Sequence, residues 1–220
     1  MRNPWDDPET VARFAAREPD RRLADLLDAM LPGEAPRVLD LGCAGGRNTV
    51  LLAQRGCDVH ALDASAAMVA ETRRRLAQIA GAAEAEQRVL QGKMDDLSRF
   101  GDGELDLVIA LGVFQEAGSL EEWHRAVDES ARVLRPDGRL LVAHFAPGTD
   151  LTGHHGAPIE GRQDLYEPSP GSRNVLLGQT RLDAAMREHG LMPVVPSETV
   201  NVGTGEGGRR VTVNALYRRG

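Results

Sequence analysis

A glycine-rich turn follows the first strand-like segment of the chain, in the sequence VLDLGCAGGRNT at residues 38–49. Where a parallel strand ends and a helix begins, backbone amides point at whatever lies above the sheet edge. Glycine lets a ligand approach there without a Cβ in the way. Asp63 ends the next strand-like segment, 21 residues after Gly42, about where a nucleoside-binding sheet places a carboxylate for ribose hydroxyls. The pattern predicts a nucleoside site; the alternative is a tight turn beside a solvated strand end.

The spacing of the glycines separates two kinds of nucleoside cofactor. A dinucleotide-binding turn reads G-x-G-x-x-G, and Gly42, Ala44 and Arg47 fill those three positions here. Two of the three required glycines are therefore missing. This mismatch disfavours an NAD-dependent oxidoreductase, which remains an alternative.

The same turn resembles the first motif of class I S-adenosylmethionine-dependent methyltransferases, which reads acid-x-Gly-x-Gly-x-Gly. Asp40, Gly42, Ala44 and Gly46 occupy those positions, with alanine in place of the commoner central glycine. The resemblance continues through DASAAM (63–68), ARVLRPDGRLLVA (131–143) and the C-terminal strands, so it covers the chain from about residue 36 onward. It implies S-adenosylmethionine as the cofactor and methyl transfer to a small-molecule acceptor by in-line displacement. A protein that binds this cofactor without turnover is a further alternative.

The resemblance also implies roles for individual residues. The methionine part of the cofactor would be wrapped by Gly42, Cys43, Ala44 and Gly46, with Asp40 facing its amino group. Asp63 would take the ribose hydroxyls. The adenine would lie beside Ala64, Met68, Met94 and Asp95. The family commonly has an acidic residue where this chain has Lys93, so Asp95 is predicted to supply the carboxylate near the adenine amino group. Leu111, Gly112 and Val113, at the end of a strand, would line the site near the reactive methyl.

Candidate catalytic and acceptor-binding residues are fewer. His144 ends a strand at the sheet edge where ligands bind, and its ordinary pKa suits a base near neutral pH. The alternative is a structural histidine that packs at the strand end and takes no part in catalysis. Acceptor recognition is predicted to involve Trp5, Phe14, Gln115 and Tyr166, with Glu116 beside Gln115. Core packing or helix entry would explain the same residues. His154 and His155, near Glu160, lack the spacing of a helical zinc motif, so no metal is predicted.

The composition and net charge indicate which kinds of molecule this protein is expected to bind. The 220 residues carry a formal charge of −7 and are 41% hydrophobic. Nucleic acids and anionic membranes need an excess of basic residues, so neither is an expected partner. No apolar run is long enough to span a bilayer, and the start lacks the apolar segment of a signal peptide. The sequence therefore predicts a cytoplasmic protein that acts on a small molecule. Its two cysteines are predicted to stay reduced. No sequence pattern indicates the oligomeric state.

Alternating apolar periods predict the elements that position these residues. Strands are expected at 37–42, 57–63, 87–92, 104–114 and 139–146, with a terminal hairpin at 191–200 and 209–219. Helices are expected at 6–18, 20–31, 47–56, 65–81, 119–134 and 180–190. This order predicts one α/β domain: a doubly wound, Rossmann-like, seven-stranded sheet, mostly parallel with an antiparallel C-terminal hairpin strand. Its expected parts are a helical cap (1–34), a cofactor-binding core (35–146), an irregular cap or substrate loop (147–178) and a C-terminal helix with hairpin (179–220).

Overall fold

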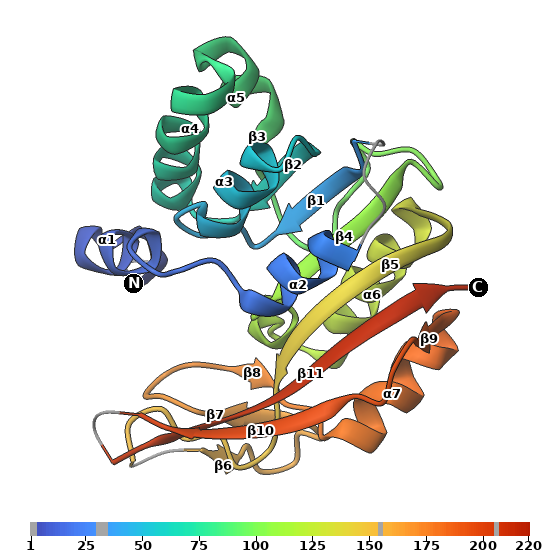
Figure 1. Cartoon of the computed structure of the whole chain (residues 1–220). Coiled ribbons are helices and arrows are strands. Elements are labelled where there is room, and N and C mark those ends of the chain that lie inside the picture. Colours follow the sequence, from blue (N-terminus) through green and yellow to red (C-terminus); the bar gives the residue numbers. More distant parts are fainter. Residues whose placement is uncertain (1–3, 30–34, 154–155, 205–206) are drawn as a thin grey trace. The chain divides into compact units, whose positions relative to one another are not determined.

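The computed structural model describes residues 4–29, 35–153, 156–204 and 207–220, shown in Figure 1. The fold is mixed α/β with a central, mostly parallel sheet and an antiparallel C-terminal hairpin, which confirms the predicted class. Two compact units make up the chain. Unit 1 comprises Met1–Met94 with Glu104–Ile109, and unit 2 comprises Asp95–Gly103 with Ala110–Gly220.

Unit 1 alternates strands and helices along the chain. Its elements are η1 (Pro4–Asp6), α1 (Pro8–Ala15), α2 (Arg21–Ala29), β1 (Arg37–Leu41), α3 (Arg47–Gln54), β2 (Asp58–Asp63), α4 (Ala66–Ala80), α5 (Ala82–Arg88), β3 (Val89–Gln91) and most of β4 (Leu105–Leu111). The strands run parallel in the order β4-β1-β2-β3. Parallel strands covered on both faces need apolar side chains throughout, and the apolar stretch of β4 from Leu107 to Ala110 is fully buried.

Polar side chains cap two helices of unit 1, and one helix of this unit was not predicted. Asp7 caps α1 by accepting from Thr10 N at 2.9 Å, and Ser65 caps α4 by accepting from Met68 N at 3.2 Å. Between α4 and β3 the strand prediction at 87–92 began too early, because α5 continues to Arg88. Alanine and glutamate favour helix there, and Arg88 binds Glu84 one turn earlier at 2.6 Å.

Unit 2 is mostly antiparallel. Its elements are η2 (Phe114–Glu116), α6 (Leu120–Val133), β5 (Leu134–Phe145), β6 (Ala157–Pro158), β7 (Leu165–Glu167), β8 (Asn174–Val175), α7 (Gln179–Glu188), β9 (Leu191–Pro193), β10 (Glu198–Gly203) and β11 (Arg209–Arg219). β11 pairs with β5, β9 and β10, so the predicted hairpin is confirmed. The strand predicted at 191–200 is split into β9 and the start of β10.

The stretch predicted to be irregular, 147–178, contains a small antiparallel sheet. Its strands follow the order β6-β7-β8 (Figure 1). Each strand has only two or three residues, which is too short for an apolar period to be visible in the sequence.

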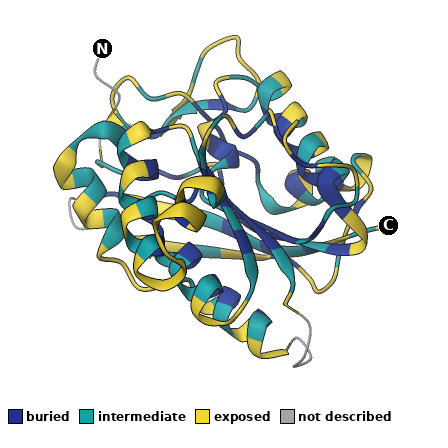
Figure 2. Cartoon of the chain, turned by 90° about the horizontal axis from the view of Figure 1, so that it is seen from above, coloured by how far each residue is buried: buried dark blue, intermediate teal, exposed yellow. Residues whose placement is uncertain are grey.

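Buried residues concentrate along the strands, as the dark blue segments of Figure 2 show. In unit 2 the largest fully buried side chains are Trp123, Tyr217 and Phe114. The inward face of α6 is formed by Trp123, Val127 and Val133, which are all fully buried. None of the helices in the described part of the chain combines the length and hydrophobicity needed to cross a membrane.

The N-cap of α6 offers a test of how local sequence fixes this fold. Ser119 accepts from Glu122 N at 3.1 Å, so Ser119→Ala leaves an amide of the first turn without its partner. We expect the variant to lose about 1 kcal/mol of unfolding free energy, measured by urea denaturation. Ser119→Asp, which retains an acceptor, should unfold close to the parent; equal losses in both variants would contradict the capping role.

Candidate functional site

The glycine loop (residues 42–46) connects β1 to α3 in unit 1. The amides of Gly42 and Cys43 both donate to Leu62 O, at 2.8 and 3.1 Å, which anchors the loop to β2. Gly42, Ala44 and Gly46 all have positive φ, at 73°, 47° and 76°. Left-handed backbone is readily adopted by glycine and is strained for alanine. Ala44, the departure from the motif, therefore adopts the conformation for which the family uses glycine.

Asp63 holds Ala44 in that conformation. Its Oδ2 accepts from Ala44 N at 2.8 Å and its Oδ1 accepts from Ser65 N at 2.9 Å. Burial raises the pKa of Asp63, while these backbone donors lower it. A carboxylate offers about four lone-pair sites, so each oxygen can accept another hydrogen bond. The side chain is only half-buried, which leaves it accessible to a ligand with hydroxyl donors.

Asp40 is the second carboxyl of the site. It is 2% exposed, and its Oδ2 accepts from Thr49 Oγ1 at 2.6 Å. Burial raises the pKa of Asp40 to about 6, and the nearby charge of Asp63 also raises it. The hydrogen bonds from Thr49 and the charge of Arg47 lower this pKa in part. A cationic group, such as the amino group of a methionine moiety, would stabilise the buried carboxylate further.

α4 supports the glycine loop from behind. Thr72 Oγ1 donates to Ala44 O at 2.6 Å, and Arg75 donates to Gly45 O at 2.7 Å and to Ala15 O at 2.9 Å. A Cβ on Gly45 would lie 2.6 Å from the backbone of Ala15, so only glycine permits this approach of α1. The sequence analysis assigned no role to Thr72 or Arg75, because neither belongs to a recognisable motif.

The N-terminal segment is tied to the end of β2. Ser65 Oγ lies 3.0 Å from Trp5 O and 2.6 Å from a carboxylate oxygen of Asp6. The rings of Trp5 and Phe14 meet edge to face at 5.3 Å, and the guanidinium of Arg17 lies 4.0 Å from the centre of the Phe14 ring. Both aromatic side chains are half-buried, so they stay candidates for acceptor recognition.

The other predicted cofactor contacts of unit 1 differ in accessibility. Ala64 is exposed, and its carbonyl accepts from Gln91 Nε2 at 3.1 Å. Met68 and Met94 are 1% and 8% exposed, so both side chains pack in the interior. Met94 is therefore expected to contact a ligand through its backbone rather than through its side chain.

Asp95 and Leu111 belong to unit 2. Asp95 Oδ2 accepts from Arg125 Nη2 at 3.0 Å, whereas Asp95 Oδ1 is buried and has no partner among the described residues. Buried acceptors are normally paired, so this oxygen marks a position suited to a donor on a ligand. Leu111 is half-buried at the end of β4, next to Gly112 with φ of 91°.

The environment of His144 argues against the predicted base role. Its Nε2 accepts from Trp123 Nε1 at 2.9 Å, which leaves the proton on Nδ1, 2.7 Å from Phe145 O. The side chain is fully buried, and burial lowers its pKa to about 4. Both ring nitrogens are hydrogen-bonded within the protein, so the contacts of His144 fit a structural histidine at the strand end better than a catalytic base.

Two predicted acceptor residues also lie in unit 2. Gln115 is 2% exposed in η2, and Tyr166 is half-buried in β7. His154 and His155, from which no metal site was predicted, lie outside the described residues.

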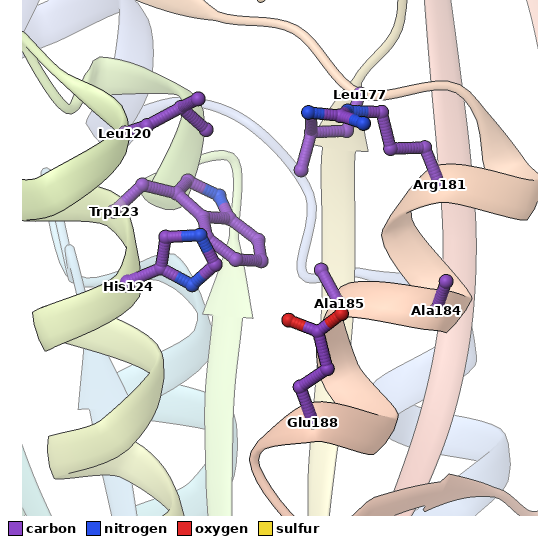
Figure 3. Close-up of a pocket in the computed structure, with 8 residues that line it drawn as sticks. All are labelled: Leu120, Trp123, His124, Leu177, Arg181, Ala184, Ala185 and Glu188. Atoms are coloured by element: carbon purple, nitrogen blue, oxygen red, sulfur yellow. The ribbon is translucent and has the colours of Figure 1, made fainter.

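A cavity of about 120 Å³ opens between α6 and α7 of unit 2. Leu120, Trp123 and His124 line it from α6, and Arg181 and Glu188 line it from α7 (Figure 3). Ligand sites for cofactor-sized molecules usually enclose about 300–1,000 Å³. This cavity is too small for a nucleoside cofactor, and none of its lining residues carries the predicted motif.

The raised pKa of Asp40 predicts a pH-dependent stability. An unfolded aspartate titrates near pH 3.9, so the ligand-free protein becomes less stable as pH rises from about 4 to about 6, by roughly 3 kcal/mol in all. Asp40→Asn removes this titration and keeps an acceptor for Thr49. We expect the variant to gain stability over the parent between pH 4.5 and pH 8 in urea denaturation. The exposed Asp25→Asn is the control; a stability difference for Asp40→Asn that does not change with pH would refute the assignment.

Comparison with known proteins places these features in a family. A family described as "Methyltransferase domain" matches residues 39–142. An uncharacterized methyltransferase of Mycobacterium tuberculosis is 33% identical over 158 residues, covering 66% of this chain and 58% of that protein. A malonyl-[acyl-carrier protein] O-methyltransferase of Enterobacter lignolyticus is 37% identical over 152 residues, covering 65% and 56%. The chain thus spans a little over half the length of these curated relatives.

Solved structures share the fold. PH0226 protein from Pyrococcus horikoshii aligns with a TM-score of 0.65 at 20% identity, covering 99% of this chain and 94% of that one. The 1,6-didemethyltoxoflavin-N1-methyltransferase of Burkholderia thailandensis, solved with its substrate and S-adenosylhomocysteine, aligns with a TM-score of 0.63 at 22% identity, covering 90% and 77%. Together with the glycine loop and its two carboxyls, the sequence matches identify residues 39–142 as a methyltransferase domain of the class I S-adenosylmethionine-dependent kind.

Proposed function

We propose that this chain transfers a methyl group from S-adenosylmethionine to a small-molecule acceptor. The observation that carries the proposal is the pairing of Asp63 with Ala44 N and Ser65 N. This pairing sets a carboxylate with spare acceptor capacity beside a left-handed loop. Such an arrangement suits a ribose next to a flexible polar tail.

The residues of unit 1 fit the chemistry of this cofactor. Asp63 offers acceptors to two neighbouring ribose hydroxyls, and the buried Asp40 gains a cationic partner from the amino group. Met94 would offer its backbone to the adenine. Asp95, which belongs to unit 2, stays a predicted adenine contact, because its Oδ1 has no hydrogen-bond partner among the described residues and the exocyclic amine is a donor. When bound, S-adenosylmethionine supplies a methyl carbon that its positively charged sulfur already activates.

The task left to the protein is mainly alignment. Displacement at an activated methyl needs the attacking atom held close and in line, and it needs a base only where that atom must lose a proton. Leu111, the last residue of β4, and Gly112 remain the predicted wall beside the methyl group. Trp5, Phe14, Gln115 and Tyr166 remain the residues proposed to contact the acceptor.

A small acceptor is favoured over a macromolecule by charge. The formal charge of −7 gives no excess of basic residues to neutralise phosphates. The Burkholderia protein that shares the fold was solved with didemethyltoxoflavin, and a Synechocystis protein that shares the fold is named as a magnesium protoporphyrin IX methyltransferase. Both names indicate small acceptors for those proteins and support the same class here.

Calorimetric titration separates the candidate cofactors. We expect S-adenosylhomocysteine to bind and NAD not to bind. Asp63→Asn should weaken S-adenosylhomocysteine about 10- to 150-fold, because a hydrogen bond to a charged group is worth about 1.5–3 kcal/mol. Asp25→Asn, an exposed change in the same unit, should bind like the parent.

Three results would count against the proposal. Binding of NAD without S-adenosylhomocysteine would restore the oxidoreductase alternative. Equal affinity of the parent and Asp63→Asn for S-adenosylhomocysteine would remove the ribose assignment. Retained binding with no methyl transfer to any acceptor tested would favour the non-catalytic binding protein.

A further inference from the structure

Strand β10 forms one edge of the central sheet and lies wholly within unit 2. Its residues Glu198–Gly203 pair with β11 on one side (Figure 1), and no described strand pairs with the other side. An unpaired strand edge is a template for a further strand, so folded proteins usually blunt such edges with proline, lysine or a bulge. β10 has neither proline nor lysine, and it pairs with β11 without a bulge over all six residues. The edge is therefore open to a strand from outside.

Backbone hydrogen bonds show which groups of β10 point outward. Val211 of β11 accepts from Ala146 N at 2.9 Å and donates to Thr149 Oγ1 at 3.1 Å, so its backbone turns away from β10. Asn201 lies opposite Val211, and opposite residues of an antiparallel pair exchange both bonds or neither. The N–H and C=O of Asn201 therefore point outward, and alternation gives Thr199 the same orientation. In the part of the chain that the structure describes, no hydrogen bond satisfies these outward groups.

Helix α7 holds the start of β10 in place. Gln179 Nε2 donates to Ser197 O at 2.8 Å, and Gln179 Oε1 accepts from Thr199 Oγ1 at 3.0 Å. Ser197 Oγ donates to Asp183 Oδ2 at 2.6 Å. The edge is thus fixed at one end before a partner arrives, which lowers the entropy cost of adding a strand.

One face of the β10–β11 hairpin, which we call the open face, carries two opposite charges. Glu198, Val200 and Val202 share this face of β10, because successive side chains alternate. Arg210 lies on the same face, since it is opposite Val202. Val202 is 44% exposed, and Glu198 and Arg210 are exposed as well. Among the described residues, neither charge has an ion-pair partner.

We propose that β10 pairs antiparallel with β10 of a second copy of this chain, about a two-fold axis at Val200. In this register Thr199 of each copy lies opposite Asn201 of the other, so the outward groups of both residues are hydrogen-bonded. Val200 lies opposite its own counterpart in a pair that is not hydrogen-bonded, where side chains approach most closely. Two-fold contacts use the same surface on both partners. This inference does not depend on the proposed function.

The charges favour a second copy over an unrelated strand. The axis places Glu198 of each copy opposite Val202 of the other, and Arg210 is the next residue in that row. Glu198 and the other copy's Arg210 are then two strands apart, about 10 Å between Cα atoms, which their long side chains can span over the intervening valine. The dimer forms this contact twice. An axis at Asn201 would also pair outward groups, but it moves Glu198 out of the row of Arg210.

Sedimentation at increasing protein concentration tests the pairing. We expect analytical ultracentrifugation of the parent to show a monomer–dimer equilibrium. Val200→Lys sets two ammonium groups side by side at the axis, and like charges directly opposite are unfavourable. The dissociation constant should rise about tenfold or more, which corresponds to about 1.4 kcal/mol.

Ile79→Lys is the matched control, because Ile79 is a similarly exposed apolar side chain, at 42%, on α4. This variant should dimerise like the parent. A parent that stays monomeric at every concentration would overturn the proposal. A dimer that Val200→Lys leaves intact, or that Ile79→Lys weakens equally, would also overturn it.

A charge exchange tests whether the partner is a second copy in this register. Glu198→Arg and Arg210→Glu, each alone, place like charges in the same row and should weaken the dimer several-fold at low ionic strength, where screening is small. The double variant Glu198→Arg/Arg210→Glu restores opposite charges and should dimerise close to the parent. Because the double variant is judged by recovery, misfolding of a single variant cannot mimic the expected result. A double variant as weak as the single ones, or single variants as strong as the parent, would refute the register.

Discussion

The double hydrogen bond accepted by Asp63 is the contact on which the candidate cofactor site depends. One carboxylate joins the loop after β1 to the cap of α4, and the Asp63 carbonyl accepts from Gly92 N at 3.0 Å, just after β3. Three parallel strand ends are thereby held in register at one edge of the sheet. Ala44 keeps its left-handed conformation because its amide has this partner and its carbonyl has Thr72.

The two carboxyls of the site differ in what stabilises them. Asp63 accepts from two backbone donors, while Asp40 is buried, accepts from Thr49 and lies near the charge of Arg47. Burial raises the pKa of both carboxyls, and the charge of Asp63 raises that of Asp40 further. A buried charge is unfavourable for folding and favours the binding of a cation. The site therefore carries a stability cost that a positively charged ligand group offsets.

The features that could be predicted from the sequence are those that depend on contacts between residues close together in the chain. The glycine loop, Asp63 and the caps at Asp7, Ser65 and Ser119 each depend on a few neighbouring residues, so their patterns are visible in the sequence. Long-range contacts were missed. Arg75 reaches Ala15 and Gly45 across the fold. His144 carried a suitable ordinary pKa, and only its burial against Trp123 altered that interpretation. The short strands of the small sheet are likewise defined by partners rather than by their own periodicity.

The same difference between short-range and long-range contacts separates the residues assigned to the methyl donor from those proposed for the methyl acceptor. Every residue assigned to the cofactor lies within the family match at 39–142, and most lie in two short segments after β1 and β2. Glu116 is also inside that match, but its hydrogen-bond partner Asn174 is outside it. Family membership therefore indicates the methyl donor and leaves the acceptor open. Of the residues proposed to contact the acceptor, Trp5, Phe14 and Tyr166 lie outside the match, so the family pattern carries no information about them.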